Sequence, residues 1–238
     1  MTRRPSLGSG WRRAVGEFLL IVAGILVALW IEDWRQARID RATEIEYLSR
    51  LTIDVDQDLI DLENQIAHTP MREEQALAVL DFLDSERAAD RSVLQAFNQA
   101  GWIAFFRFNR STMDDLLSTG NLSLLGDKSL VRQLNNYYRS GDFLREFDDA
   151  KKLWIWEGYR RSLDHHIPSR LFTLDPDEEE RLAAVGWDAL RGDRDVRAGL
   201  EHVMTVAAVE RRHLERVREA ANELGSAVAD RHARLTGS

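Results

Sequence analysis

Residues 14–31 read AVGEFLLIVAGILVALWI, an apolar run whose one charged residue is Glu17. A helix from Trp11 to Trp30 rises roughly 28 Å, close to the roughly 30 Å of hydrocarbon in a bilayer. Trp11 and Trp30 lie where an aromatic belt is expected, and Trp34 follows one turn further on. We therefore predict a single-pass transmembrane helix at 14–31, a short basic N-terminus at 1–13 and an extramembrane helical domain at 32–238.

The charges beside this span predict its orientation. Four arginines precede it, whereas the arginines that follow it lie beside Glu32 and Asp33. By the positive-inside rule we expect a cytoplasmic N-terminus and an exported body, in the inner membrane of a bacterium. A cleaved signal peptide is the alternative, but no Ala-x-Ala-like exit follows the span, which favours an uncleaved anchor. The residues expected to hold the helix ends at the two interfaces are Trp11, Arg12, Arg13, Trp30 and Trp34.

Composition limits the partners of the body. The chain carries a net charge of −8, and its first 31 residues carry +3, which leaves −11 on the remainder. An acidic body argues against nucleic-acid binding, because phosphates attract the opposite charge. The chain has no cysteine, so a disulfide framework, a thiolate zinc site and a cysteine nucleophile are excluded.

A heptad register, as in a coiled coil, continues from the span into the body. Steps of three and four residues from Glu17 reach Gly24, Ile31, Ile45, Leu48, Leu59 and Leu62, with Arg38 and Arg41 as the interruptions. These arginines are expected near the headgroups, where they contact lipid phosphate or only extend toward the interface. We predict an all-α fold in which the transmembrane helix continues into an elongated helical bundle.

The same register suggests that the protein is a homo-oligomer. Gly24 and Ala28 form a small-xxx-small pair that permits close approach of two spans. Glu17 lies on the face of Gly24 and is either an ion or proton site, a polar ring in an oligomer, or a carboxyl that reaches the interface beside Arg12 and Arg13. The stripe outside the membrane packs against a second copy or, alternatively, against helices of its own body.

Further along the chain, turn and cap signals divide the body into helices. We predict a helix break at His68-Thr69-Pro70, after which Leu77, Leu80 and Leu83 form the apolar face. Ser92 is expected to cap a short helix, and residues 101–108 are expected to pack as buried aromatics between helices. Asp127 should cap a long helix that continues toward His166, Asp175-Pro176 should open another that Gly192 interrupts, and a final helix should bury a stripe from Val196 to Val228.

A family resemblance covers the chain up to about Arg139. Residues 16–31, GEFLLIVAGILVALWI, and residues 111–122, STMDDLLSTGNL, resemble the two motifs of a family of bacterial single-span proteins catalogued only as a domain of unknown function. Met113 and Trp30 depart from the family pattern. In the second motif, Ser111 and Asp114 predict a capping box, and Gly120-Asn121 predicts the turn that ends the helix. The family has no established activity, so the resemblance implies none.

Motifs for catalysis or metal binding are incomplete. Glu210 and His213 have the spacing of a bundle metal pair, but no second pair exists, and pairing of Glu210 with an arginine of another helix is favoured. Asp54-x-Asp56-x-Asp58 lacks the glycine and glutamate of a calcium loop and is interpreted as a solvated acidic face. The aromatic residues of this region line either a ligand cleft or the core; they are Trp154, Trp156, Tyr159, Tyr137 and Tyr138.

Together these observations predict no catalytic residue, metal or cofactor. We expect a membrane-anchored interaction or scaffold protein of the bacterial envelope, with lipid, a second copy of itself and another envelope protein as partners. The alternative is a sensory ligand-binding bundle that acts through a separate signalling partner, since the short N-terminus leaves no room for an output domain.

Overall fold

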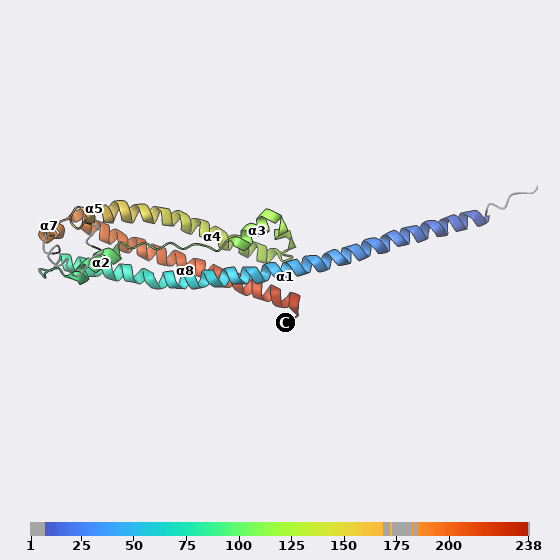
Figure 1. Ribbon diagram of the computed structural model, residues 1–238, viewed down its shortest axis with the longest axis horizontal. Helices are drawn as coiled ribbons and strands as arrows, with labels where there is room; N and C mark the ends of the chain where they lie inside the picture. The colour runs from blue at the N-terminus through green and yellow to red at the C-terminus, as the bar shows by residue number, and fades with distance from the viewer. Residues whose placement is uncertain (1–7, 169–171, 173–181, 183–184, 238) are drawn as a thin grey trace, which may run out of the picture.

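The computed structural model describes residues 8–168, 172, 182 and 185–237 and confirms the all-α prediction, with no strand in this part of the chain. The major helices are α1 (Gly8–Leu83), α2 (Arg91–Ala100), α3 (Ser111–Thr119), α4 (Lys128–Leu153) and α8 (Arg194–Thr236). Shorter segments are a 3₁₀ turn at Asn121–Leu124, a π-helix at Trp154–Arg160, α5 (Arg161–Asp164) and α7 (Trp187–Arg191). Figure 1 shows a long body from which the N-terminal part of α1 projects alone.

The projecting part of α1 contains the predicted span. It is long and apolar enough to cross a membrane, and its most apolar 18-residue window has a mean hydropathy of 2.5 with none of its residues buried. The first buried side chain along α1 is Glu44, so α1 joins the body more than a dozen residues after Ile31. One continuous helix therefore connects the apolar segment to the core of the body.

The predicted break at His68-Thr69-Pro70 is wrong, because α1 continues through Pro70 to Leu83. A proline inside a helix costs about 3 kcal/mol, but Leu62 before it and Ala76 after it are both fully buried in the body. Packing of both halves of the helix offsets that cost. The apolar face predicted after the break is also partly wrong, because Leu77 is exposed and the buried positions include Val79 and Phe82.

Helix α8 is the centre of the bundle, since it packs along α1 and also along α4. Its predicted apolar stripe is confirmed at every position. The buried residues of this stripe are Val196, Leu200, Val203, Ala207, Glu210, Leu214, Val217, Ala221, Leu224 and Val228. In the α1 stripe outside the apolar segment, Leu48 and Leu62 are fully buried and Ile45 and Leu59 partly buried within the same chain, so this part packs against helices of its own body, the alternative to packing against a second copy.

The segment from Gly101 to Arg110 runs extended between α1 and α4, from α2 to α3 (Figure 1). Its predicted burial is confirmed only in part. Phe106 is buried, and Phe108 lies so close to Gly141 on α4 that a Cβ there would be 2.3 Å from the ring. Trp102 and Phe105, in contrast, are exposed on the surface.

Buried carboxylates on α1 hold these connecting segments in place. Asp58 accepts the backbone N–H of Asn109 at 2.8 Å and the Tyr137 hydroxyl at 2.6 Å. Asp54 accepts the backbone N–H of Thr112 at 3.1 Å. The prediction of a solvated acidic face is therefore wrong for Asp54 and Asp58, because each carboxylate satisfies a backbone donor that packing removes from water.

Several predicted helix ends are corrected by the side chains that cap them. Asp90, and not Ser92, is the N-cap of α2, and it accepts the Ser92 hydroxyl. No capping box opens α3, because the Ser111 hydroxyl donates to Asp54 and Asp114 pairs with Arg110. Tertiary partners thus replace the local hydrogen bonds that the sequence predicts.

Other predicted ends are confirmed. Gly120 ends α3 with a left-handed φ of 74°, and Asn121 follows it in the 3₁₀ turn. Asp127 caps α4 by accepting the backbone N–H groups of Ser129 and Leu130. The helix predicted to run toward His166 passes into the π-helix and ends with α5 at Asp164. Asp175-Pro176 lies outside the described residues.

Candidate functional site

A layer of charged side chains divides the core of the body into two parts. The core nearer the apolar segment of α1 reaches Leu62, Leu144 and Leu214, and the distal core begins again at Ala76, Ile155 and Val206. Arg72 on α1, Asp148 and Lys151 on α4, and Glu210 on α8 occupy the level between them, and all four are buried. We refer to these four residues as the charged layer.

Glu210 is the centre of the charged layer. Its carboxylate accepts hydrogen bonds from Arg72, from Lys151 at 2.6 Å and from Gln65 at 3.1 Å. Burial alone would raise the pKa of this carboxyl, but the charges and hydrogen bonds of Arg72 and Lys151 outweigh burial and lower its pKa. The predicted pairing of Glu210 with an arginine of another helix is therefore confirmed.

Asp148 completes the charge balance of this layer. One of its oxygens lies 2.7 Å from the Lys151 ammonium, yet neither oxygen makes a geometrically acceptable hydrogen bond. Burial raises the pKa of Asp148, and the nearby Lys151 charge reduces that rise without cancelling it. The layer thus holds two cationic and two acidic side chains inside an apolar bundle, an arrangement that is costly unless every partner stays in place.

The extended segment covers this charged layer. The backbone carbonyl of Ala104 accepts hydrogen bonds from Lys151 at 2.7 Å and from Gln65 at 3.3 Å. Between Ile103 and Phe108, no backbone N–H donates a hydrogen bond to another residue in the described part of the chain. Lys151 and Gln65 therefore hold the segment through its Ala104 carbonyl, whereas the N–H groups of residues 103–108 have no acceptor among the described residues.

Exposed aromatic side chains surround this segment. Trp102 is 45% exposed, Phe105 is 40% exposed, and Trp156 of the π-helix is 60% exposed. We call these three residues the aromatic surface. Contiguous apolar groups of this kind on a folded protein mark interaction sites more often than isolated ones do. Of the two alternatives for the aromatic residues of this region, the core holds for Tyr137, Tyr138 and Tyr159, whereas Trp154 and Trp156 are exposed and Trp156 lines a groove.

Two grooves flank the extended segment and share Trp102 and Phe105. The first, of about 470 Å³, lies toward the π-helix and is also lined by Lys152, Trp156 and Arg160. The second, of about 430 Å³, lies toward α1 and is also lined by residues that include Asp61, Asn64, His68 and Arg107. Both volumes are within the range of small-molecule or peptide side-chain pockets.

The π-helix shapes the first groove. A π-helical turn inserts an extra residue into a helix, and such turns are frequent at functional sites. Here it keeps Ile155 and Tyr159 buried while Trp156 is exposed. The Tyr159 hydroxyl donates to the carbonyl of Phe97, and Arg160 donates to Asn98, so that the π-helix is joined to α2.

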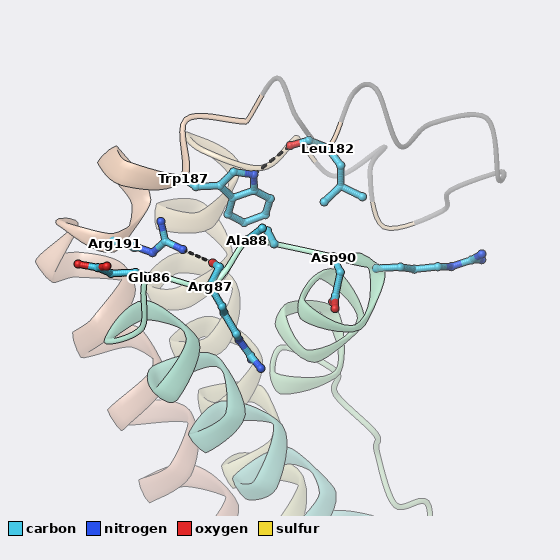
Figure 2. Close-up of a pocket in the computed structure, with 9 residues that line it drawn as sticks. Glu86, Arg87, Ala88, Asp90, Leu182, Trp187 and Arg191 are labelled. Carbon is cyan, nitrogen blue, oxygen red and sulfur yellow. Dashed lines mark hydrogen bonds between the residues drawn. The ribbon is translucent and has the colours of Figure 1, made fainter.

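A further pocket of about 480 Å³ lies at the far tip of the body. Figure 2 shows Trp187 and Leu182 on one side, where the Trp187 indole donates to the Leu182 carbonyl at 2.9 Å. The charged side chains of Glu86, Arg87 and Asp90 point away from a common centre in the same view. Because polar groups do not converge there, this pocket offers little basis for ligand specificity.

The residues predicted from sequence to form sites lie elsewhere. Glu17, Gly24 and Ala28 are exposed on α1, and nothing lies within 4 Å of a Cβ built at Gly24. Trp11, Trp30 and Trp34 are also exposed, while the side chains of Arg12 and Arg13 fall outside the described residues. The interfaces assigned to these residues stay predictions.

The structure shows what surrounds the other residues that the sequence suggested as lipid-contacting or metal-binding. Arg38 lies over the Trp34 ring at 5.0 Å, and Arg41 donates to the carbonyl of Leu235 at the end of α8. His213 packs in a tilted arrangement against the rings of Phe143 and Phe147, with 4.8 Å and 5.4 Å between ring centroids. No group of three or more potential metal ligands occurs among residues that the structure describes.

Sequence reasoning missed the lysine of the charged layer and the aromatic surface. One signal was present, since Glu210 interrupts an apolar stripe and therefore requires buried cations nearby. Nothing in the periodicity of α4 distinguishes Lys151, which is buried, from Lys152, which is exposed, because the register of a helix against its neighbours is a tertiary property.

No protein-family model matches this chain, and no significant similarity to a curated protein or to a solved structure was found. The resemblance of residues 16–31 and 111–122 to a family of bacterial single-span proteins therefore stays a prediction.

Proposed function

We propose that this protein is a membrane-anchored interaction protein of the bacterial envelope, which holds a docking surface at a fixed distance from the membrane. The observation that carries the proposal is the continuity of α1, which joins an unburied apolar segment to the body that carries the aromatic surface. From Ile31 to Arg72 this helix rises roughly 60 Å. The rigid body then positions the docking surface far outside the lipid.

The orientation is part of the proposal. Arginines before the span support a cytoplasmic N-terminus and an exported body. Protease added to spheroplasts should remove a tag at the C-terminus and spare one at the N-terminus. A C-terminal tag that survives until the cells are lysed contradicts this orientation.

Self-association is proposed for the span alone. Gly24 and Ala28 permit close packing of two helices in lipid, with Glu17 on the Gly24 face. The body half of the predicted interface is not available to a second copy, because Leu48 and Leu62 are fully buried by helices of the same chain.

A sensory ligand-binding bundle is the second candidate. The two grooves beside the extended segment favour it, because each is large enough for a small ligand. A small molecule retained after mild detergent extraction would support this candidate, whereas a stoichiometric protein partner would support the docking function.

Site-specific photo-cross-linking in native membranes tests the docking function. A photoreactive phenylalanine analogue replaces Phe105 or Trp156 in the full-length protein, and the matched control replaces Glu219, which is exposed on α8. We expect a discrete product of higher mass from the first two positions and none from the control. Absence of any product, or equal products from all three positions, would overturn the proposal.

A further inference from the structure

Residues 103–108, the middle of the extended segment, have the properties of an edge strand with no pairing partner among the described residues. Their backbone is extended, and their N–H groups make no hydrogen bond to other described residues. A row of free backbone donors and acceptors is a template on which a second extended chain can add as a strand. The charged layer holds the segment through the Ala104 carbonyl, so the edge is fixed before a partner arrives.

The surroundings of this edge specify the partner further. Trp102 and Phe105 separate two grooves, and a strand added along one edge of the segment lies over one of them. Lys152 and Arg160 line the groove toward the π-helix together with one acid, Asp164, whereas Arg107 shares the second groove with Asp61. The excess of positive charge in the groove toward the π-helix, on a body of net charge −11, favours an acidic ligand there.

We propose that the edge at residues 103–108 binds an extended, acidic peptide segment of a partner protein by strand addition. Backbone hydrogen bonds provide affinity, the groove toward the π-helix accepts side chains of the added strand, and Lys152 and Arg160 attract carboxylates. This inference rests on the proposed docking function, because it assigns a partner class to the same aromatic surface.

Fluorescence anisotropy with the full-length protein in detergent tests this assignment. The probe is a labelled nine-residue peptide of alternating glutamate and valine. One comparison peptide carries lysine in place of glutamate, and another carries N-methyl groups on alternate backbone nitrogens. We expect saturable binding of the glutamate peptide, and binding at least about tenfold weaker for both comparison peptides.

A pair of variants isolates the contribution of the protein backbone. Arg107→Pro removes both the N–H and the charge at position 107, whereas Arg107→Ala removes only the charge. Arg107→Pro should weaken binding about tenfold more than Arg107→Ala. Thermal melting checks that both variants fold, and the N-methylated peptide tests backbone pairing without any change to the protein.

The outcomes separate this inference from the docking function. If the glutamate peptide fails to bind wild type, or if the N-methylated peptide binds equally well, strand addition is wrong. If a chito-oligosaccharide binds in place of the peptide and Trp156→Ala abolishes that binding, the peptide assignment is overturned while the aromatic surface stays a docking site. The docking function itself fails only if cross-links at Phe105 and Trp156 are absent or no different from those at Glu219.

Discussion

Replacement of Glu210 by leucine should be among the most destabilising single changes in the body. Glu210 is fully buried and accepts hydrogen bonds from Arg72, Lys151 and Gln65. Leucine has a similar volume, so Glu210→Leu removes the charge without leaving a large cavity. The two cations then face Asp148 alone, and the layer retains one buried positive charge without a partner.

The magnitude follows from that uncompensated charge. Breaking a buried ion pair by removing one partner costs roughly 3–5 kcal/mol. For a domain of this size, each kcal/mol lowers the melting temperature by roughly 2–4 °C. We therefore expect Glu210→Leu to lower the melting temperature of the body by about 10 °C.

Circular dichroism at 222 nm during thermal unfolding of the full-length protein in detergent measures this change. Glu215→Leu, an exposed position on the same helix, is the matched control and should melt near wild type. The double variant Arg72→Met with Glu210→Leu should recover much of the loss, because Lys151 and Asp148 then form a neutral pair. A melting temperature for Glu210→Leu within about 2 °C of wild type, well below the range expected for a broken buried pair, would refute this reasoning.

The remaining predictions concern a buried acid, a turn and the span. Burial raises the pKa of Asp58 from 3.8 to about 6, so the native state binds this proton more tightly than the unfolded state does. The stabilisation that protonated Asp58 provides is then present below pH 3.8 and is lost as pH rises to about 6. Asp58→Asn should remove up to about 3 kcal/mol of the pH dependence of the free energy of unfolding. Identical pH profiles of this free energy for wild type and Asp58→Asn would contradict the prediction. Gly120 has a φ of 74° with open space around it, so Gly120→Ala should cost about 1 kcal/mol and Gly120→Val more. An unchanged melting midpoint for Gly120→Val would show that the turn is not strained by a side chain. Gly24→Ile should reduce cross-linked oligomers in native membranes by separating the two spans, and a wild-type protein that stays monomeric at every expression level would exclude self-association.

Sequence patterns correctly predicted those structural features that depend only on residues close together in the sequence. The apolar run at 14–31 and the stripe on α8 could be read directly, because helical periodicity determines which side chains share a face. Gly120 could be predicted as a helix end and Asp127 as a cap, because a left-handed turn and a free helix N-terminus each favour few residue types.

Where the prediction from sequence was wrong, contacts between segments far apart in the sequence determine the structure. Pro70 predicts a helix break, yet α1 continues because burial on both sides of the proline is worth more than the lost hydrogen bond. Ser111 predicts a cap, yet its hydroxyl donates to Asp54, which the sequence places more than fifty residues away on α1. Such partners become neighbours only when the helices pack.

The sequence by itself determined the apolar helix that is long enough to cross a membrane, the helical class and the buried face of the last helix, since each follows from the hydrophobicity and spacing of neighbouring residues. Only the tertiary structure decided that Asp148, Lys151, Arg72 and Glu210 share one buried layer. It also decided that the segment above them exposes Trp102 and Phe105 beside backbone amides that donate to no other described residue. The physical reason is that a charge or an aromatic ring on a helix can lie in water or in the core, and the relative register of three packed helices decides between them.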